Sequence, residues 1–129
     1  METTLQHQSR AAQIGIWALR LVLGLAFLFF SFMKLSGQPN MVAEFETVGL
    51  GQWFRYFTGL LELIGGLAIL VPRWSALGAI LLLVVDLGAL VAQVAILHVD
   101  WIHVVVIGAL LALLVYLQRD TLANLRGRA

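Results

Sequence analysis

Residues 14–33 have the sequence IGIWALRLVLGLAFLFFSFM, with one charged residue, Arg20, among them. About 20 apolar residues form a helix long enough to cross the roughly 30 Å hydrocarbon core of a bilayer. A charge inside such a run is unfavourable, usually faces the interior of a helix bundle, and marks a candidate functional site. This stretch therefore predicts a membrane-spanning helix with a polar group on its packed side.

Three further apolar runs follow the first one. They cover residues 53–72, 75–97 and 101–117, and the first two of them contain Glu62 and Asp86. Because lipid offers no hydrogen-bond partner to backbone N–H and C=O groups, each run is expected to be an α-helix. The sequence predicts an all-α membrane protein, a bundle of four transmembrane helices. It forms one domain over residues 1–129, with tails at 1–13 and 118–129.

The composition excludes several classes of function. Of the 129 residues, 61% are hydrophobic and 12% are charged, whereas soluble domains have about 25% charged residues. Much of the surface must therefore face the lipid bilayer. The net charge of +1 gives no electrostatic basis for binding nucleic acid. The absence of cysteine excludes disulfide exchange, thiolate metal sites and iron–sulfur clusters.

The first connection, residues 34–52, is longer than the others. Within it, residues 39–49 begin with a proline and end with a glycine, as many short helices do. Val42, Phe45 and Val48 recur on one side of that segment. The pattern predicts a short amphipathic external helix between the first two spans, on the membrane surface or against the end of the bundle.

The basic residues predict the orientation of the chain. The side opposite to the 34–52 connection holds Arg10, Arg73, Arg119, Arg126 and Arg128. By the positive-inside rule, this side is cytoplasmic, so both termini are expected in the cytoplasm.

Polar and small residues share helix faces when successive residues are rotated by about 100°. The first span aligns Arg20, Gly24, Ser31 and Lys34; the second aligns Gly59, Glu62 and Gly66 beside Gly65; the third aligns Asp86 and Gln93. Small residues let helix backbones approach closely in lipid. These faces are therefore predicted to pack against one another.

The charges near the middle of the membrane do not balance. Glu62 and Asp86 both lie near mid-depth, and Arg20 can reach them from the cytoplasmic side. A buried carboxylate without a partner is unfavourable and takes up a proton instead. We therefore expect Arg20 to pair with one carboxylate, while the other is protonated or hydrogen-bonded to Gln93.

A second polar cluster is expected at the external mouth of the bundle. It consists of Lys34, Arg55, His98, Asp100 and His103. Lys34 and Arg55 are also suited to the simpler role of interfacial anchors. The two histidines have no clear third ligand apart from Asp100, so no metal site is predicted.

Several of these segments together resemble the DoxX-like family. The resemblance covers about residues 14–117 and rests on Arg20, Ser31-Phe32-Met33-Lys34-Leu35, Gly49-Leu50 before Trp53, Gly59-Leu60-Leu61-Glu62-Leu63-Ile64-Gly65-Gly66 before Pro72, and His98. It implies a four-helix protein of the bacterial inner membrane. The family includes membrane subunits of a thiosulfate:quinone oxidoreductase and a component of a bacterial membrane oxidoreductase complex. More distant relatives resemble assembly chaperones. The family often has glycine where Ser31 stands, and Asp86 lies outside its pattern.

The residues and the resemblance together favour an accessory subunit of a membrane redox system. It would bind a quinone or another amphipathic small molecule at Arg20, Lys34, Glu62, Asp86, Gln93 and His98. No catalytic residue is predicted, and quinone is the one cofactor implied. Because the chain itself supplies no electron carrier, a membrane or peripheral redox protein is the expected partner, and self-association into a homo-oligomer is compatible with the pattern.

Two other interpretations stay open. In the first, the Arg20–Glu62 pair is structural, and the protein is a non-enzymatic assembly factor or scaffold that contacts its partner through residues 39–49. In the second, the protein is a proton-coupled exporter, because small multidrug transporters are also four-helix proteins with a membrane glutamate. The position of the acid in the second span argues against the exporter.

Overall fold

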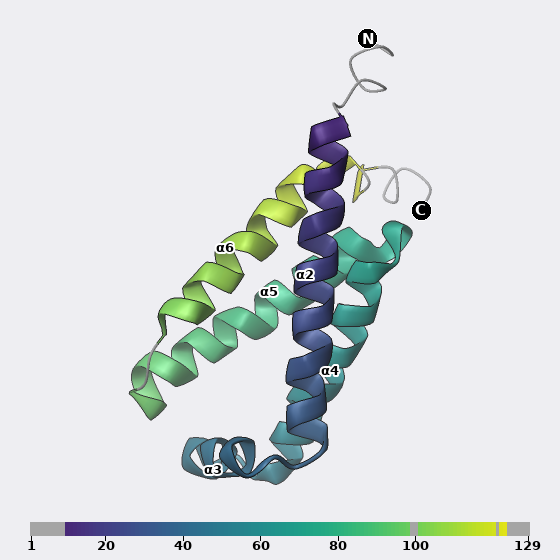
Figure 1. Ribbon diagram of the computed structural model, residues 1–129. Helices are drawn as coiled ribbons and strands as arrows, with labels where there is room; N and C mark the ends of the chain where they lie inside the picture. Colours follow the sequence, from purple (N-terminus) through teal and green to yellow (C-terminus); the bar gives the residue numbers. More distant parts are fainter. Residues whose placement is uncertain (1–9, 99–100, 121, 124–129) are drawn as a thin grey trace.

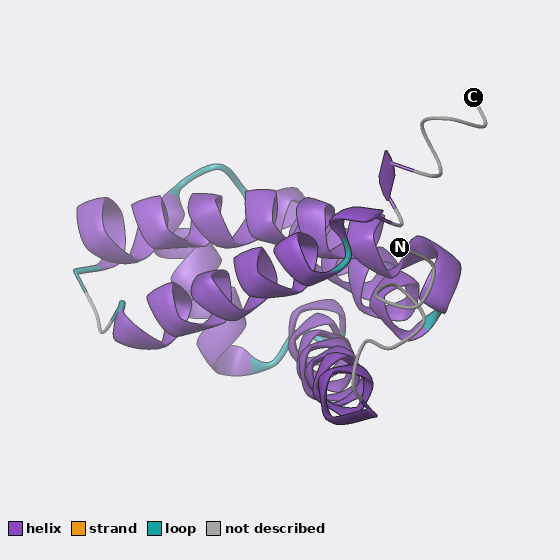
Figure 2. Cartoon of the chain, turned by 90° about the horizontal axis from the view of Figure 1, so that it is seen from above, coloured by secondary structure: helices purple, strands orange, loops and turns teal. Residues whose placement is uncertain are grey.

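The computed structural model describes residues 10–98, 101–120 and 122–123, and the regular elements in these ranges are helices (Figures 1 and 2). In chain order they are α2 (Arg10–Leu35), α3 (Pro39–Val48), α4 (Gln52–Leu70), the 3₁₀-helix η1 (Pro72–Trp74), α5 (Ser75–Val91), the π-helix η2 (Ala92–Leu97) and α6 (Ile102–Leu117). The all-α fold predicted from the sequence is confirmed.

Three segments are long and apolar enough to cross a membrane. They are α2, α4, and the continuous stretch of η1, α5 and η2 from Pro72 to Leu97. The fourth helix, α6, is also apolar but has 16 residues, which corresponds to about 24 Å at 1.5 Å per residue. Large apolar side chains such as Val22, Phe32 and Leu87 are exposed on the outside of the bundle. These exposed side chains suit a lipid environment, and the helices indicate a multi-pass membrane protein.

The short helix α3 has clear start and stop signals. Pro39 occupies its first position, and the side chain of Gln38 accepts a hydrogen bond from the backbone N–H of Asn40. At the other end Gly49 has φ 85°, a left-handed conformation that glycine adopts without a steric penalty. The helix lies across the end of the bundle that is opposite to the start of α2 (Figure 1). The predicted amphipathic helix is therefore present and packs against the bundle.

The antiparallel helices α2 and α4 approach each other through their backbones. A Cβ atom added to Gly24 would lie 3.2 Å from the carbonyl oxygen of Gly66, and one added to Gly66 would lie 3.1 Å from that of Gly24. A Cβ on Gly59 would lie 3.0 Å from Leu35, and one on Gly65 would lie 2.5 Å from Leu82 of α5. Small residues are required at such crossings because even a methyl group has no room.

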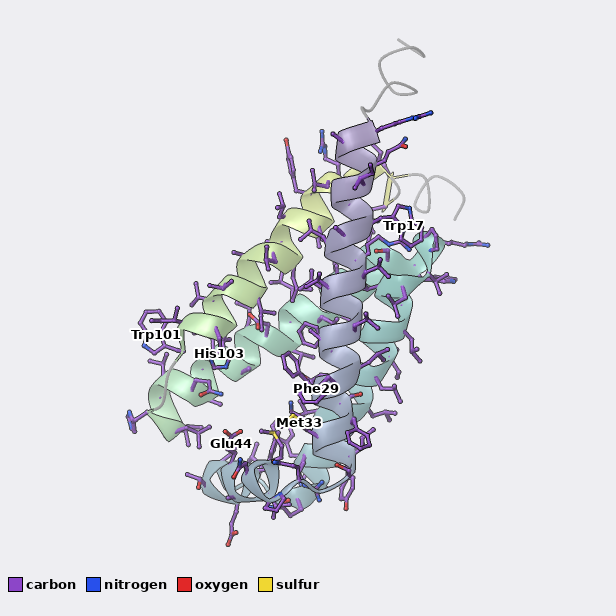
Figure 3. All side chains as sticks on the ribbon, in the orientation of Figure 1. Trp17, Phe29, Met33, Glu44, Trp101 and His103 are labelled. Carbon is purple, nitrogen blue, oxygen red and sulfur yellow. The ribbon has the colours of Figure 1, made fainter. Side chains whose placement is uncertain are left out.

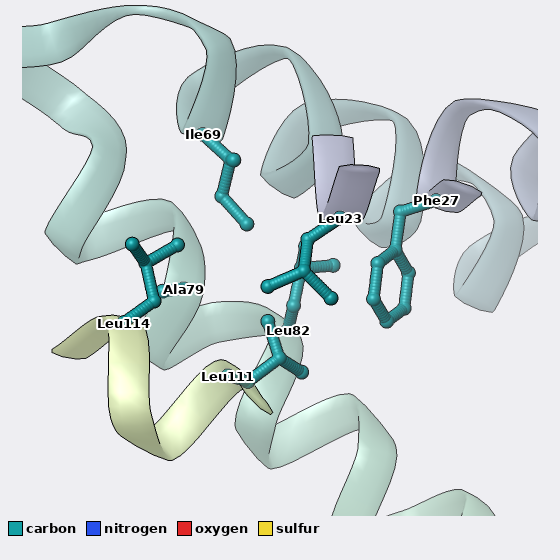
Figure 4. Close-up of a cluster of buried hydrophobic side chains, with 7 residues drawn as sticks. All are labelled: Leu23, Phe27, Ile69, Ala79, Leu82, Leu111 and Leu114. Atoms are coloured by element: carbon teal, nitrogen blue, oxygen red, sulfur yellow. The ribbon is translucent and has the colours of Figure 1, made fainter. Parts of the chain in front are cut away.

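An apolar core fills the half of the bundle nearer to the start of α2 (Figure 4). It is formed by the buried side chains of Leu23, Phe27, Ile69, Ala79, Leu82, Leu111 and Leu114. These residues come from α2, α4, α5 and α6, so the core joins all four long helices. We call this part of the molecule the sealed half, and the part next to α3 the chamber half.

Candidate ligand-binding site

The chamber half contains a partly open cavity of about 760 Å³, which we call the chamber. Side chains from α2, α3, α4, α5, η2 and α6 line it. Figure 3 shows Phe29 and Met33 on α2, Glu44 on α3 and His103 on α6 around this space. Small-molecule sites typically have volumes of about 300–1,000 Å³. The chamber is thus large enough for an organic ligand.

Aromatic rings dominate the wall of the chamber. Six of the seven phenylalanines of the chain line it: Phe27, Phe29, Phe30, Phe45, Phe54 and Phe57. The rings of Phe45 and Phe54 lie 5.9 Å apart and connect α3 to α4. Rings at such distances attract each other beyond simple area burial. The wall therefore offers several ring faces and edges to an apolar or ring-shaped ligand.

An ion pair forms the polar part of the chamber wall. Lys34 Nζ, near the end of α2, lies 2.8 Å from Oε1 of Glu62 in the middle of α4, and the two side chains are 15% and 7% exposed. Both residues line the chamber. Since each charge is balanced locally, the pair can persist in the apolar interior, where an isolated charge would be strongly disfavoured.

Arg20 does not pair with either carboxylate, so that prediction is wrong. Its Nε donates to the carbonyl oxygen of Ile69 at 2.9 Å and its Nη2 to that of Leu70 at 3.1 Å, and its guanidinium lies 3.9 Å from the ring centre of Trp17. The last carbonyl groups of a helix lack intrahelical partners and carry the negative end of its dipole. Arg20 is therefore satisfied by the end of α4, and it does not line the chamber.

Arg55 makes the reciprocal contact at the opposite end of the same helix pair. Its Nη1 donates to the carbonyl oxygen of Lys34 at the end of α2, and its Nε donates to Oε1 of Gln52 at 2.8 Å. Its side chain is buried, so it is not a surface anchor. Each of the two antiparallel helices thus has its C-terminal end bound by an arginine of the other helix. Arg55 also fixes the backbone of Lys34, the residue whose side chain pairs with Glu62.

Asp86 lies on the buried side of α5 and faces α6. A Cβ atom added to Gly108 would lie 2.5 Å from its Oδ2. Asp86, His103 and Glu62 all line the chamber. The absence of a side chain at Gly108 is what leaves room for this carboxylate.

Gln93 belongs to the π-helix η2 and also lines the chamber. Short π-helical segments occur often at functional sites. Its Oε1 atom is buried and accepts no hydrogen bond from the described residues, whereas Oε1 of Glu62 lies 2.8 Å from the ammonium nitrogen of Lys34. The amide oxygen of Gln93 is therefore an acceptor without a donor in the part of the chain that the structure describes.

The structure brings together part of the predicted ligand site. Lys34, Glu62, Asp86 and Gln93 all line the chamber, whereas Arg20 and His98 do not. His98 follows η2 with φ 52° and is exposed. Asp100, predicted in the same cluster as His98, lies outside the described residues.

The sequence analysis did not assign three kinds of chamber residue to the ligand site. Glu44 enters from α3, His103 enters from α6, and the phenylalanines form most of the wall. The sequence did contain a signal that could have placed aromatic rings at the site, because Phe45 lies on the apolar side of the 39–49 segment. Among the described residues, no group of three His, Cys, Asp or Glu side chains is placed to hold a metal ion.

The fold and the site define a class: a multi-pass helical membrane protein with an aromatic-lined chamber between its helices. The model of the DoxX-like family matches residues 18–117, so the chain belongs to the DoxX-like family. It is also similar to a protein of Bacillus subtilis (strain 168) named "Putative oxidoreductase CatD", with 24% identity over 83 residues. These residues are 64% of this chain and 62% of that protein, so the similarity spans less than two thirds of the relative. No solved structure matches the chain.

Proposed function

We propose that this protein binds a quinone or another amphipathic small molecule in its chamber, as an accessory subunit of a membrane redox system. The observation that carries the proposal is the cavity of about 760 Å³ with an ion pair, Lys34–Glu62, in an otherwise largely aromatic and aliphatic wall. An apolar pocket with a few convergent polar groups is the usual design of a small-molecule site. The name of the Bacillus subtilis relative supports the redox context.

The residues of the chamber have distinct roles in this proposal. The phenylalanine rings hold the apolar body of the ligand, and Lys34 and Glu62 bind its polar head. Asp86 and His103 provide further polar contacts from α5 and α6. Since the chain has no cysteine, and thiolate-bound clusters are thereby excluded, a partner protein supplies the electrons.

We further propose that the protein lies in the bacterial cell membrane with both termini in the cytoplasm. The start of α2 and the end of α6 lie at one end of the bundle and α3 lies at the other (Figure 1). Arg73 sits in η1, the connection that follows α4. The cysteine-free chain allows a direct test: Asn40→Cys should react with a membrane-impermeant maleimide in intact cells and Arg73→Cys should not. The reverse pattern would contradict this orientation.

Ligand binding is tested by fluorescence of a variant in which Trp53 is the single tryptophan. Its ring centre lies 5.6 Å from that of Phe54 and 6.1 Å from that of Phe57, both of which line the chamber. A short-chain quinone titrated into this variant in lipid nanodiscs should quench the emission to saturation at a ratio near one ligand per protein.

A pair of alanine substitutions provides the matched control. Ala92→Phe places a ring in the chamber wall and should abolish saturable quenching. Ala109→Phe adds the same ring to an exposed position on α6 and should leave the quenching unchanged. Non-saturable quenching, or equal loss in both variants, would refute binding in the chamber.

One observation favours an assembly factor as the second candidate. Arg20 and Arg55 both bind helix-end carbonyl groups, so part of the buried charge serves to hold the bundle together. If the protein is a scaffold, Glu62→Gln should lower its yield without changing the binding of small molecules, and a stoichiometric membrane protein should purify with it.

A further inference from the structure

Some residues of the chamber wall are also exposed on the outside of the bundle. Phe57 of α4 and Val84 of α5 line the chamber and are 48% and 62% exposed, and Gly88 of α5 lines it and is exposed as well. Phe27 and Val104 line the same chamber and are buried, so contact with the cavity does not by itself expose a side chain. The chamber therefore reaches the outer surface between α4 and α5. We call the gap bordered by Phe57, Val84 and Gly88 the side opening.

The side opening lies where α4 and α5 separate. Nearer to the sealed half the two helices touch, because a Cβ atom added to Gly65 of α4 would lie 2.5 Å from Leu82 of α5. Past this contact, a Cβ added to Gly88 would meet no atom of the described residues within 4 Å. Val84 and Gly88 are four residues apart and thus share one side of α5. The divergence of α5 from α4 toward the end where α3 lies is visible in Figure 1.

The side opening faces hydrocarbon rather than water. Val84 lies at the midpoint of the candidate membrane span Pro72–Leu97. The outer surface beside it is apolar, since Leu60 of α4 and Leu87 of α5 are exposed there. At the end of the bundle, by contrast, residues of α3 border the chamber. A molecule dissolved among the lipid chains therefore meets the side opening directly.

The polar part of the chamber lies near the side opening. Phe57 precedes Glu62 by five residues on α4, which corresponds to about 7.5 Å along the helix axis. Glu62 in turn pairs with Lys34 at 2.8 Å. An apolar chain gains no hydrophobic free energy by moving from lipid into protein, so nothing favours enclosing a long tail. A ligand with its head at the ion pair can leave its tail in the bilayer.

We propose that the chamber takes its ligand from the bilayer through the side opening. The ligand is a single-chain amphiphile whose head lies at Lys34 and Glu62 and whose tail passes between α4 and α5 into the lipid. This proposal rests on the proposed function, because it names the access route and the ligand class of the same site. The chamber then recognises the head of the ligand, and the length of the tail has little effect on binding.

The first experiment varies the tail and keeps the head constant. Ubiquinones with tails of two, four and eight isoprene units are titrated in nanodiscs into the variant with Trp53 as its single tryptophan. Affinities from saturable quenching, expressed per amount of lipid to remove the effect of partitioning, should agree within about threefold. An affinity that falls as the tail lengthens would indicate an enclosed ligand and would overturn the proposal while the proposed function stands. No saturable binding of any of them would overturn both.

A pair of glycine substitutions tests where the tail leaves the bundle. Gly88→Phe places a ring in the side opening and should weaken binding of the longest ubiquinone at least about tenfold more than that of the tail-free head. Gly15→Phe adds the same ring to an exposed position of α2 outside the chamber lining and should change neither affinity. Equal effects of Gly88→Phe on both ligands would overturn this route. The tail would then leave elsewhere, such as beside the exposed lining residues Phe29 and His103.

Reversible closure of the side opening tests entry. The chain has no cysteine, so the double variant Phe57→Cys/Val84→Cys can be bridged by a bifunctional thiosulfonate reagent. The bridge should slow the exchange of bound decylubiquinone at least about tenfold, and a reducing agent, removed before the measurement, should restore the rate. The single-cysteine variants carry the reagent without a bridge and should be slowed less. Failure of the two cysteines to bridge although both are labelled, or exchange that the bridge does not slow, would contradict the proposal.

Discussion

The sealed half and the chamber half are built on the same two helices and treat charge in opposite ways. In the sealed half, Arg20 is bound by carbonyl groups of α4, Ser75 donates a buried hydrogen bond to Gln118, and the core cluster is apolar. In the chamber half, three carboxylates and one ammonium group line a cavity of about 760 Å³. The comparison separates two tasks: one end holds the helices together, and the other end gathers polar groups around a cavity.

The difference follows from how the helices diverge. α2 and α4 stay in contact along their length through glycines such as Gly24 and Gly59. α5 and α6 incline away from α2 toward the end where α3 lies (Figure 1). Residues of α3 and phenylalanine rings border the space that opens between them. The helices are therefore closely packed in the sealed half, and their divergence leaves the cavity in the chamber half.

The largest effect is expected at the ion pair of the chamber half. Lys34→Met leaves Glu62 without its counter-charge and should lower the free energy of unfolding by about 3 kcal/mol. The double variant Lys34→Met/Glu62→Met removes both charges and should recover most of that loss. Unfolding by sodium dodecyl sulfate in bicelles measures both values. A single variant as stable as the unmodified protein would show that the pair contributes nothing.

Overpacking should be the next largest effect, and two glycines of α5 test it, one in the sealed half and one at the chamber. A Cβ on Gly78 would lie 2.7 Å from the Cβ of Ala68 and 2.9 Å from the carbonyl oxygen of Gly65, so Gly78→Ala should cost about 2 kcal/mol. Gly88 of the same helix has no atom within 4 Å of the added position. Gly88→Ala should be neutral or slightly stabilising, because alanine favours helix. Similar melting temperatures for the two variants would contradict the close packing described for the sealed half.

Arg20→Met tests whether the two halves are independent. Loss of two charge-assisted hydrogen bonds to α4 should destabilise the protein by about 1.5 kcal/mol. The affinity for a chamber ligand should stay within about twofold, a difference well below 1.4 kcal/mol. Thermal unfolding in detergent and ligand titration are measured on the same sample. Loss of binding with unchanged stability would assign Arg20 to the ligand site.

The smallest effect on stability is expected for Phe45→Ala in α3. The side chain is half-buried, and its ring contact is with Phe54 across the chamber wall. The free energy of unfolding should fall by about 1 kcal/mol or less, in proportion to the apolar area exposed. Ligand affinity should fall more clearly, because a ring of the wall is removed. Unchanged affinity would show that α3 does not contribute to the site.

The helices were predictable from the sequence because hydropathy and helix-end signals are local. The 20-residue apolar runs predict the long helices, and Pro39 and Gly49 mark both ends of α3. The chamber was partly predictable, because the helix faces of Glu62, Asp86 and Gln93 all point toward it.

The partner of Arg20 was not predictable, because periodicity gives the face of a helix but not its axial position against a neighbour. Arg20 lies level with Ile69, which is seven residues beyond Glu62 and thus about 10 Å further along α4. Backbone carbonyl groups, which no sequence pattern shows, then satisfy it. His98 was misplaced for another reason: η2 has a wider turn than an α-helix, and the positive φ of His98 redirects the chain.

The helix that borders the chamber at its outer end, α3, contributes no fully buried side chain. It is joined to its neighbours at Gly37, Gly49 and Gly51, which have φ values of 75°, 85° and 100°. A segment with few buried contacts separates from a protein at a fraction of the free energy of global unfolding. The ten residues of α3 can therefore detach briefly while the glycine-packed helix pair stays intact. Hydrogen exchange would report this as rapid loss of protection in α3 alone.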